Sequence, residues 1–317
     1  MLGQTGDPAT LAHNLVLRAE LSKLVASLED QGMDVVVLKG IPLALRLFGS
    51  IAARSMVDND LLVRRAQAVR AVRLLSAAAY QSFDSRTIET QLSLDYQFRM
   101  ARPLPGGGSL CAELHWNAFS NILYPVPEEV LWEHVESFTC DGSTVRVFDR
   151  PLTLVHLAAH FAQSEFAVRQ ILRDIAGAWN LWYAGSAADE AVELARRIGL
   201  VDALDFALLA AADLGLLDSA PPPIRSRRAS RLRRFLPAER LCEPRPTPDY
   251  ARWFLTLLLV DPSRARIWLK NALFPPLENL AAIEGVSPSP LLRWRYLIRP
   301  FRALGRAASR RERVLRG

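Results

Sequence analysis

The stretch Val57-Asp58-Asn59-Asp60-Leu61-Leu62-Val63 places two carboxylates inside an apolar run that is typical of a β-strand. In an extended backbone, residues i and i+2 point to the same face, so Asp58 and Asp60 are predicted to project side by side from a sheet. Two anions held this close repel each other unless a cation lies between them, and a divalent metal ion is the usual cation. The stretch is therefore a candidate metal site, and the alternative is a solvated Asp-Asn-Asp turn.

The residues upstream predict a strand that turns directly into a helix. After Asp34, the run Val35-Val36-Val37-Leu38 is apolar and rich in β-branched residues, and Lys39-Gly40 then leads into a helix with Pro42 in its first turn. A glycine at such a turn lets backbone N–H groups approach a phosphate, and the helix dipole favours an anion there. Lys39 and Gly40 are thus candidates for phosphate binding, with ordinary turn geometry as the alternative.

A third segment predicts the return strand of a hairpin and supplies another acid. Leu110-Cys111-Ala112-Glu113-Leu114-His115-Trp116 follows a predicted strand at Leu94 to Arg102, and Pro105-Gly106-Gly107-Gly108 lies between them. Alternation along the strand puts Glu113 and His115 on one face. Glu113 is therefore a candidate third carboxylate.

Arg54 precedes the acidic pair by four residues. A guanidinium group matches phosphate oxygens bidentately, which makes Arg54 a candidate for binding a nucleotide phosphate. The alternative is an arginine that pairs locally with Asp58 or with another acid.

Together these motifs resemble the nucleotidyltransferases of the DNA polymerase beta superfamily. More narrowly, the chain is similar to an uncharacterised nucleotidyltransferase-like family, whose members recur in bacterial gene clusters, including clusters for ribosomally made peptides. The resemblance covers about residues 33 to 117, and looser similarity continues through the helical remainder. The residues that carry it are Leu38-Lys39-Gly40, Arg54, Asp58-Asn59-Asp60-Leu61-Leu62-Val63, Tyr80 and Glu113-Leu114-His115-Trp116.

This resemblance implies an α+β protein: a minimal nucleotidyltransferase fold with a short mixed sheet in residues 1–150, followed by an all-helical domain in residues 151–317. It implies transfer of a nucleoside monophosphate from a nucleoside triphosphate to an acceptor hydroxyl. Mg²⁺ or Mn²⁺ would be held by Asp58, Asp60 and Glu113. The superfamily usually has Gly-Ser or Gly-Gly at the phosphate turn, whereas this chain has Gly40-Ile41 and so lacks that hydroxyl.

The acceptor is left open by the sequence. A small molecule, a peptide or protein side chain, and an RNA end all offer a suitable hydroxyl. Related architectures include toxin components of toxin–antitoxin pairs, which makes a toxin-like tRNA nucleotidyltransferase one alternative by fold-level analogy. A catalytically silent scaffold that keeps the fold and binds a partner is the alternative from a different functional class.

Two histidines in the second half lie one helical turn apart, at His156 and His160. A zinc site there would need further ligands, and the Glu of a His-Glu-x-x-His motif is absent, so helix packing is the favoured interpretation. The resemblance adds a third interpretation, in which this helix and the next one, bearing Asp174, face the acceptor side of the cleft. His115 is a further candidate for the acceptor side.

Other segments have clear periodicity, and from Pro151 onward every periodic segment is helical. Earlier in the chain, helices are predicted over Thr10–Asp30, 41–49, Arg65–Tyr80 and Glu128–Glu136, and a hairpin over Phe138–Phe148 that turns at Asp141-Gly142.

The composition indicates a folded globular protein, since half of the 317 residues are hydrophobic and the charges are mixed. The three cysteines lie far apart and form no disulfide framework, which favours a reducing cytoplasm. No apolar run reaches the roughly 20 residues of a membrane helix, and no signal peptide is present. The net charge of +6 rests largely on two clusters that suit RNA or an anionic surface, with arginine-rich helix faces that are merely solvated as the alternative. The clusters are Arg225, Arg227, Arg228, Arg231, Arg233 and Arg234, and then Arg293, Arg295, Arg299, Arg302, Arg306, Arg310, Arg311, Arg313 and Arg316.

Overall fold

The computed structural model describes residues 7–83, 87–140, 142–164, 169–183, 188–241, 256–284, 286 and 289–295. Most of the arginine-rich C-terminal segment, from residue 296 onward, lies outside the described residues. None of the helices in the described part of the chain is long and apolar enough to cross a membrane.

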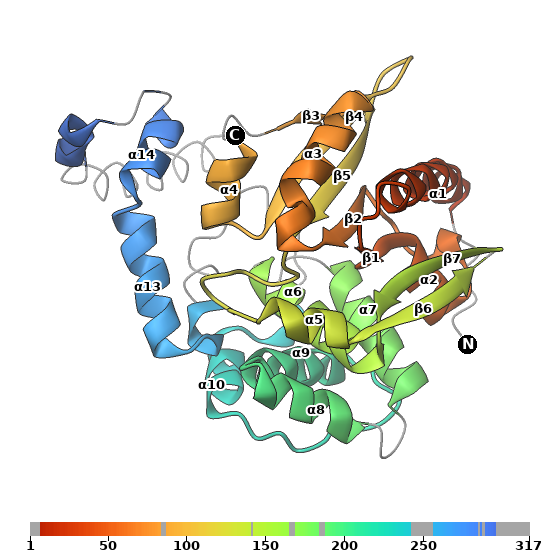
Figure 1. Cartoon of the computed structure of the whole chain (residues 1–317). Helices are drawn as coiled ribbons and strands as arrows, with labels where there is room; N and C mark the ends of the chain where they lie inside the picture. Colours follow the sequence, from red (N-terminus) through yellow and green to blue (C-terminus); the bar gives the residue numbers. More distant parts are fainter. Residues whose placement is uncertain are drawn as a thin grey trace, which may run out of the picture.

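Within these ranges seven strands form one mixed sheet in the order β3-β4-β5-β2-β1-β7-β6 (Figure 1). Strand β2, which carries the acidic pair, lies in the middle, antiparallel to β1 and parallel to β5. The strands are β1 (Val35–Val37), β2 (Asp58–Val63), β3 (Gln81–Ser82), β4 (Gln97–Pro103), β5 (Ser109–His115), β6 (Val135–Cys140) and β7 (Ser143–Phe148). The predicted α+β class with a mixed sheet is confirmed.

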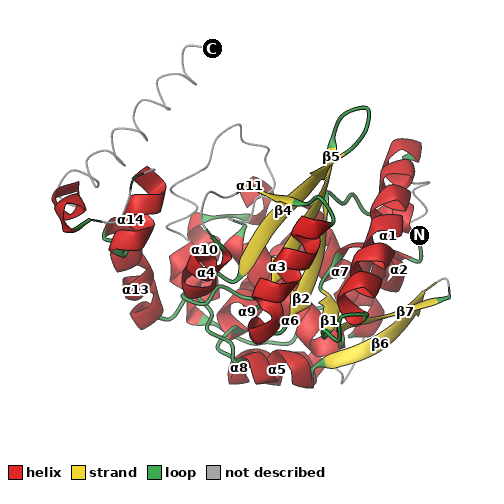
Figure 2. Ribbon diagram, turned by 45° about the horizontal axis from the view of Figure 1, so that its top comes forward, coloured by secondary structure: helices red, strands yellow, loops and turns green. Residues whose placement is uncertain are grey.

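Helices α1 (Pro8–Glu29) and α3 (Ala68–Ala77) cover one face of the sheet (Figure 2). The Asp7 side chain accepts hydrogen bonds from the backbone N–H groups of Ala9 and Thr10 and so caps α1. Leucines spaced three or four residues apart give α1 a buried stripe, because such positions share one helix face. This stripe joins the odd-numbered residues of β1 and β2 in one core: Leu17, Leu21, Leu24, Leu28, Val35, Val37, Leu61 and Val63.

Alternate residues of the same strands face the opposite layer, which is helical. Val36 and Leu62 belong to a second core that continues through the second half of the chain. This core contains residues from both sides of position 150 and so marks no boundary there. The domain boundary at residue 150 stays a prediction. The helices of this layer are α6 (Arg150–Gln163), α7 (Arg169–Trp182), α8 (Ala188–Arg197) and α9 (Val201–Asp213).

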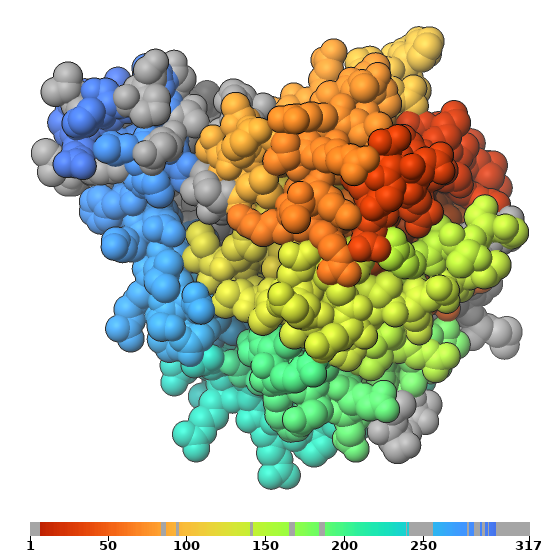
Figure 3. All heavy atoms as spheres, in the orientation of Figure 1, coloured from red at the N-terminus to blue at the C-terminus, as the bar shows by residue number. Residues whose placement is uncertain are grey.

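The remaining elements connect the layers or extend beyond them. Figure 3 shows the sheet-bearing half, coloured red to yellow, resting directly on the green helical half, with the blue α13 and α14 at one side. These elements are α2 (Gly40–Phe48), η1 (Ile51–Ala53), η2 (Arg65–Gln67), α4 (Ile88–Leu94), α5 (Glu128–Glu133), α10 (Arg227–Phe235), α11 (Ala238–Leu241), η3 (Leu257–Leu259), α13 (Pro262–Leu273), α14 (Leu277–Glu284) and η4 (Pro290–Trp294).

Three predicted boundaries were wrong. The strand predicted from Leu94 starts at Gln97, because α4 occupies Ile88–Leu94 and is capped by the Thr87 hydroxyl. The helix predicted over Arg65–Tyr80 is a 3-10 turn followed by α3, and it ends before Tyr80, where Ala79 adopts a φ of +66°. The helix predicted to reach Glu136 ends at Glu133, since β6 begins at Val135 to pair with β7.

Candidate active site

The acids of β2 and β5 meet because the two strands are neighbours in parallel register. Asp60 is the register partner of Glu113, and Asp58 is the partner of Cys111. His115 follows Glu113 by two residues and therefore shares its face. One ligand atom from each of Asp60, Glu113 and His115 lies within 4.8 Å of the others, and all three residues are buried.

His115 lies at the centre of this group. Its Nε2 atom is 3.1 Å from Asp60 Oδ1 and 3.6 Å from Glu113 Oε2. Burial by itself lowers the pKa of His115, but the hydrogen bonds to the two carboxylates outweigh it, and the pKa is raised from its ordinary value. The two acids thus favour the cationic form of the ring.

Lys39 supplies a second cation from the turn between β1 and α2. Its Nζ atom lies 3.2 Å from Asp60 Oδ2 and donates a hydrogen bond of 3.3 Å to His160 Nε2. Burial raises the pKa of Asp60, but Lys39 and His115 together overcome this effect and hold the pKa below its usual range. Gly40 follows with a φ of +68°, a conformation that favours glycine, and begins α2 as predicted.

Asp58 stands in a different electrostatic setting, although it is only two residues from Asp60. Burial, then the charges of Asp60 and Glu113, raise the pKa of Asp58 to about 6. The charges of the two neighbouring acids thus add to the effect of burial, and a divalent cation would reduce this repulsion. Asp58 is not one of the residues whose ligand atoms lie within 4.8 Å of one another in the described part of the chain.

Arg99 was missed by the sequence analysis. It is the register partner of Glu113 on β4, and its Nε atom lies 2.5 Å from Glu113 Oε1. Its side chain is 63% exposed, so it stands at the solvent side of the acids. The signal was present in the sequence, because counting back from the Gly106-Gly107-Gly108 loop pairs position 99 with position 113.

Arg54 pairs with an acid in the structure, and that acid is Asp174. Its Nε donates a 3.0 Å hydrogen bond to Asp174 Oδ2, while Gln170 Nε2 donates a 2.8 Å hydrogen bond to Asp174 Oδ1. Asp174 is fully buried, and burial raises its pKa despite the opposing charge of Arg54. The pair fixes η1, which leads into β2, against α7.

The two histidines of α6 have separate environments. The His156 ring packs edge-on against Phe119 and Phe148, with centroids 5.7 Å apart in both pairs, which supports the packing interpretation. His160 instead accepts the hydrogen bond from Lys39, and burial followed by the Lys39 charge lowers its pKa to about 3. Among the described residues, the group able to hold a metal includes neither histidine.

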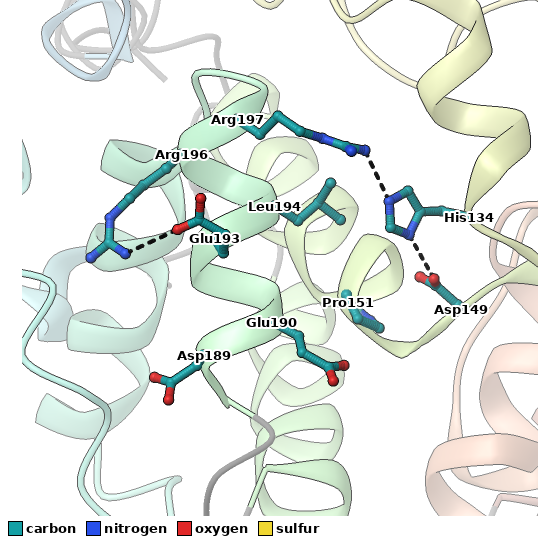
Figure 4. A pocket seen from close by; sticks show the side chains of 9 residues that line it. All are labelled: His134, Asp149, Pro151, Asp189, Glu190, Glu193, Leu194, Arg196 and Arg197. Atoms are coloured by element: carbon teal, nitrogen blue, oxygen red, sulfur yellow. Dashed lines mark hydrogen bonds and ion pairs between the residues drawn. The ribbon is translucent and has the colours of Figure 1, made fainter.

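A cavity of about 650 Å³ lies away from the acids, at the start of α6 and beside α8 (Figure 4). There His134 Nδ1 is 2.7 Å from Asp149 Oδ2, and Arg197 donates a hydrogen bond to His134 Nε2 at 3.1 Å. None of the predicted site residues lines this cavity, so its size does not make it the reaction site. The lining residues are His134, Asp149, Pro151, Asp189, Glu190, Glu193, Leu194, Arg196 and Arg197.

A family model described as uncharacterised nucleotidyltransferase matches residues 8–215. The chain belongs to this nucleotidyltransferase family. The match includes the sheet and α6 to α9, and therefore every residue described above at the acidic site. The family is itself uncharacterised, so membership indicates a class of enzyme and leaves the acceptor open.

The comparison with solved structures found similarity to the crystal structure of an antigenic nucleotidyltransferase-like protein from Paracoccidioides brasiliensis. The identity is 16%, the TM-score is 0.35, and the alignment covers 62% of this chain and 93% of that chain. At this TM-score the likeness supports no conclusion about the site. The comparison with curated proteins gave no match.

Proposed function

We propose that the chain is a metal-dependent nucleotidyltransferase that moves a nucleoside monophosphate from a nucleoside triphosphate to an acceptor hydroxyl. The main support is the meeting of Asp60 and Glu113 on adjacent strands, with Asp58 two residues before Asp60. Membership of a nucleotidyltransferase family supports the same class of reaction.

Asp58, Asp60 and Glu113 would hold the divalent ion, Mg²⁺ or Mn²⁺. The fit rests on donor chemistry, since neighbouring carboxylates suit hard divalent ions and, after burial, the charges of Asp60 and Glu113 contribute to the raised pKa of Asp58. When bound, such an ion neutralises phosphate charge and lowers the pKa of a hydroxyl.

The phosphates are proposed to lie beside the turn at Lys39 and Gly40. The N-terminus of α2 presents its backbone N–H groups there, and the helix dipole favours an anion. Arg99 adds an exposed guanidinium next to Glu113. Arg54 is proposed to act indirectly. Its buried ion pair with Asp174 holds η1, which leads into β2, against α7, so its guanidinium is not offered to a phosphate.

The acceptor is proposed to approach from the side of the helical layer. His160 touches Lys39, and His115 contacts Asp60, while His156 and Asp174 lie behind them in α6 and α7. A small molecule, a peptide or protein, and an RNA remain the classes of acceptor. An RNA would suit α10, where Arg227, Arg231 and Arg234 are exposed and form no ion pair with another described residue.

A second function, a silent scaffold, is favoured by two observations. Ile41 follows Gly40 in place of a hydroxyl residue, and both Asp60 and Glu113 already have cationic partners in Lys39 and Arg99. Such a protein would bind a partner without turning over a nucleotide.

Label transfer separates the two functions. The protein is incubated with ATP, GTP, CTP or UTP labelled at the α- or the γ-phosphorus, with Mg²⁺ or Mn²⁺, and with a cell lysate as the source of acceptor. The enzyme transfers α-label, releases labelled pyrophosphate from the γ-labelled nucleotide, and loses both activities in Asp60→Asn. Absence of α-label transfer, together with no nucleotide-dependent rise in melting temperature, would reject the enzyme and support the scaffold.

A further inference from the structure

In both Asp60 and Glu113, one carboxylate oxygen pairs with a lysine or arginine and the other faces His115. Asp60 turns Oδ2 to Lys39 and Oδ1 to His115, and Glu113 turns Oε1 to Arg99 and Oε2 to His115. The outer oxygen of each acid thus meets a cation, while the inner oxygens converge on the same imidazole nitrogen. This arrangement fixes one oxygen of each acid at the centre of the site, facing His115 Nε2.

The distances at this centre suit three ligands of a single ion. Ligand atoms about 2.0 to 2.2 Å from a tetrahedral or octahedral ion lie roughly 3.0 to 3.5 Å from each other. His115 Nε2 is 3.1 Å from Asp60 Oδ1 and 3.6 Å from Glu113 Oε2. An ion bound among the three residues would take the place of the proton that Nε2 shares with the two acids.

Among the described residues, the polar contacts of the His115 ring are made by Nε2, which faces the two acids. His115 is 4% exposed, and its Nδ1 atom has no hydrogen-bond partner in the described part of the chain. The same is true of Nδ1 in the packing residue His156, so the assignment of His115 depends on the position of Nε2 between the acids.

We infer that His115 is a ligand of the ion and that the site therefore prefers Mn²⁺ to Mg²⁺. This inference rests on the proposed function and names the metal of that same site. Imidazole is a good ligand for first-row transition ions, whereas Mg²⁺ selects oxygen ligands and keeps several waters. Lys39 and Arg99 also offset the charges of the two acids, which weakens the purely electrostatic attraction on which Mg²⁺ depends.

Electron spin echo envelope modulation of the Mn²⁺-loaded full chain tests this directly. A coordinated imidazole gives a ¹⁴N coupling to the Mn²⁺ electron spin, so the wild-type spectrum is expected to show it without any variant being needed. His115→Gln should remove the coupling and weaken Mn²⁺ binding by about tenfold or more, with Mg²⁺ affinity changed much less, since even residues that only support a ligand cost 10 to 100-fold. His13→Gln, an exposed position on α1, is the matched control and should leave the spectrum unchanged.

The outcomes separate this inference from the proposed function. Mn²⁺ that binds without ¹⁴N coupling in the wild type, or Mg²⁺ that binds as tightly as Mn²⁺, would overturn the role of His115 while leaving a metal-dependent enzyme in place. Failure of both ions to bind, with and without a nucleoside triphosphate, would overturn the proposed function as well.

Discussion

Asp60 and Glu113 are register partners on two adjacent parallel strands, and the inner oxygen of each lies within 3.6 Å of His115 Nε2. Each acid also has a cationic partner, so their charges are offset within the folded protein. Asp58, in contrast, has a raised pKa because burial and its two acidic neighbours are not fully compensated. In the metal-free protein the charge of Asp60 is therefore compensated, whereas ionisation of Asp58 is unfavourable. The predictions below follow from this difference.

Removing the Asp58 charge should stabilise the metal-free protein and weaken metal binding. The pKa of Asp58 is raised to about 6 in the folded chain, so ionisation costs stability as pH rises from the ordinary aspartate pKa through 6. Asp58→Asn should raise the free energy of unfolding in EDTA by about 1 to 2 kcal/mol at pH 7.5, and by nothing below about pH 4. Urea unfolding at the two pH values measures this. An unchanged or lower free energy of unfolding for Asp58→Asn at pH 7.5 would show that the charge of Asp58 does not destabilise the folded protein.

Lys39 should act as the counter-ion of Asp60 when no metal is bound. Its Nζ lies 3.2 Å from Asp60 Oδ2, and both side chains are largely buried. Lys39→Met leaves the buried Asp60 with His115 as its remaining cationic partner among the described residues, and is expected to cost about 3 kcal/mol in EDTA. Saturating Mn²⁺ should recover part of this loss, because it supplies the missing positive charge.

Thermal unfolding with and without Mn²⁺ measures this effect, with Lys23→Met on the exposed face of α1 as the control. Equal destabilisation of Lys39→Met in both conditions would mean that the lysine only fills space.

The pair between Arg54 and Asp174 should behave as a buried ion pair. Asp174→Leu and Arg54→Met each leave one buried polar partner behind and should each lower stability by about 3 kcal/mol, whereas the double variant Arg54→Met/Asp174→Leu should lose less than the sum. A double-mutant cycle by urea unfolding measures the coupling. Strict additivity would indicate that the 3.0 Å contact contributes no interaction energy.

Local chemistry made much of the site predictable. Asp58 and Asp60 could be assigned to one strand face from spacing alone, and alternation placed Glu113 on a matching face. The strand-to-helix turn at Gly40 was equally readable, because a positive φ favours glycine.

Contacts between distant segments were not predictable in the same way. His160 reaches Lys39 across 121 residues of sequence, and Arg54 reaches Asp174 across 120. Both contacts depend on how α6 and α7 pack on the sheet, and no local pattern specifies that packing. The central position of His115 depends likewise on the parallel pairing of β2 with β5, which brings together strands that are not consecutive in the chain.

Anomalous diffraction from crystals grown with MnCl₂ and a non-hydrolysable nucleoside triphosphate would locate the ion and the nucleotide together. The account predicts a manganese peak about 2.2 Å from an oxygen of Asp60, an oxygen of Glu113 and Nε2 of His115, with the triphosphate beside the turn at Gly40. A nucleotide bound elsewhere, or crystals in which Lys39 keeps its contact with Asp60 and no manganese lies between the acids, would contradict it.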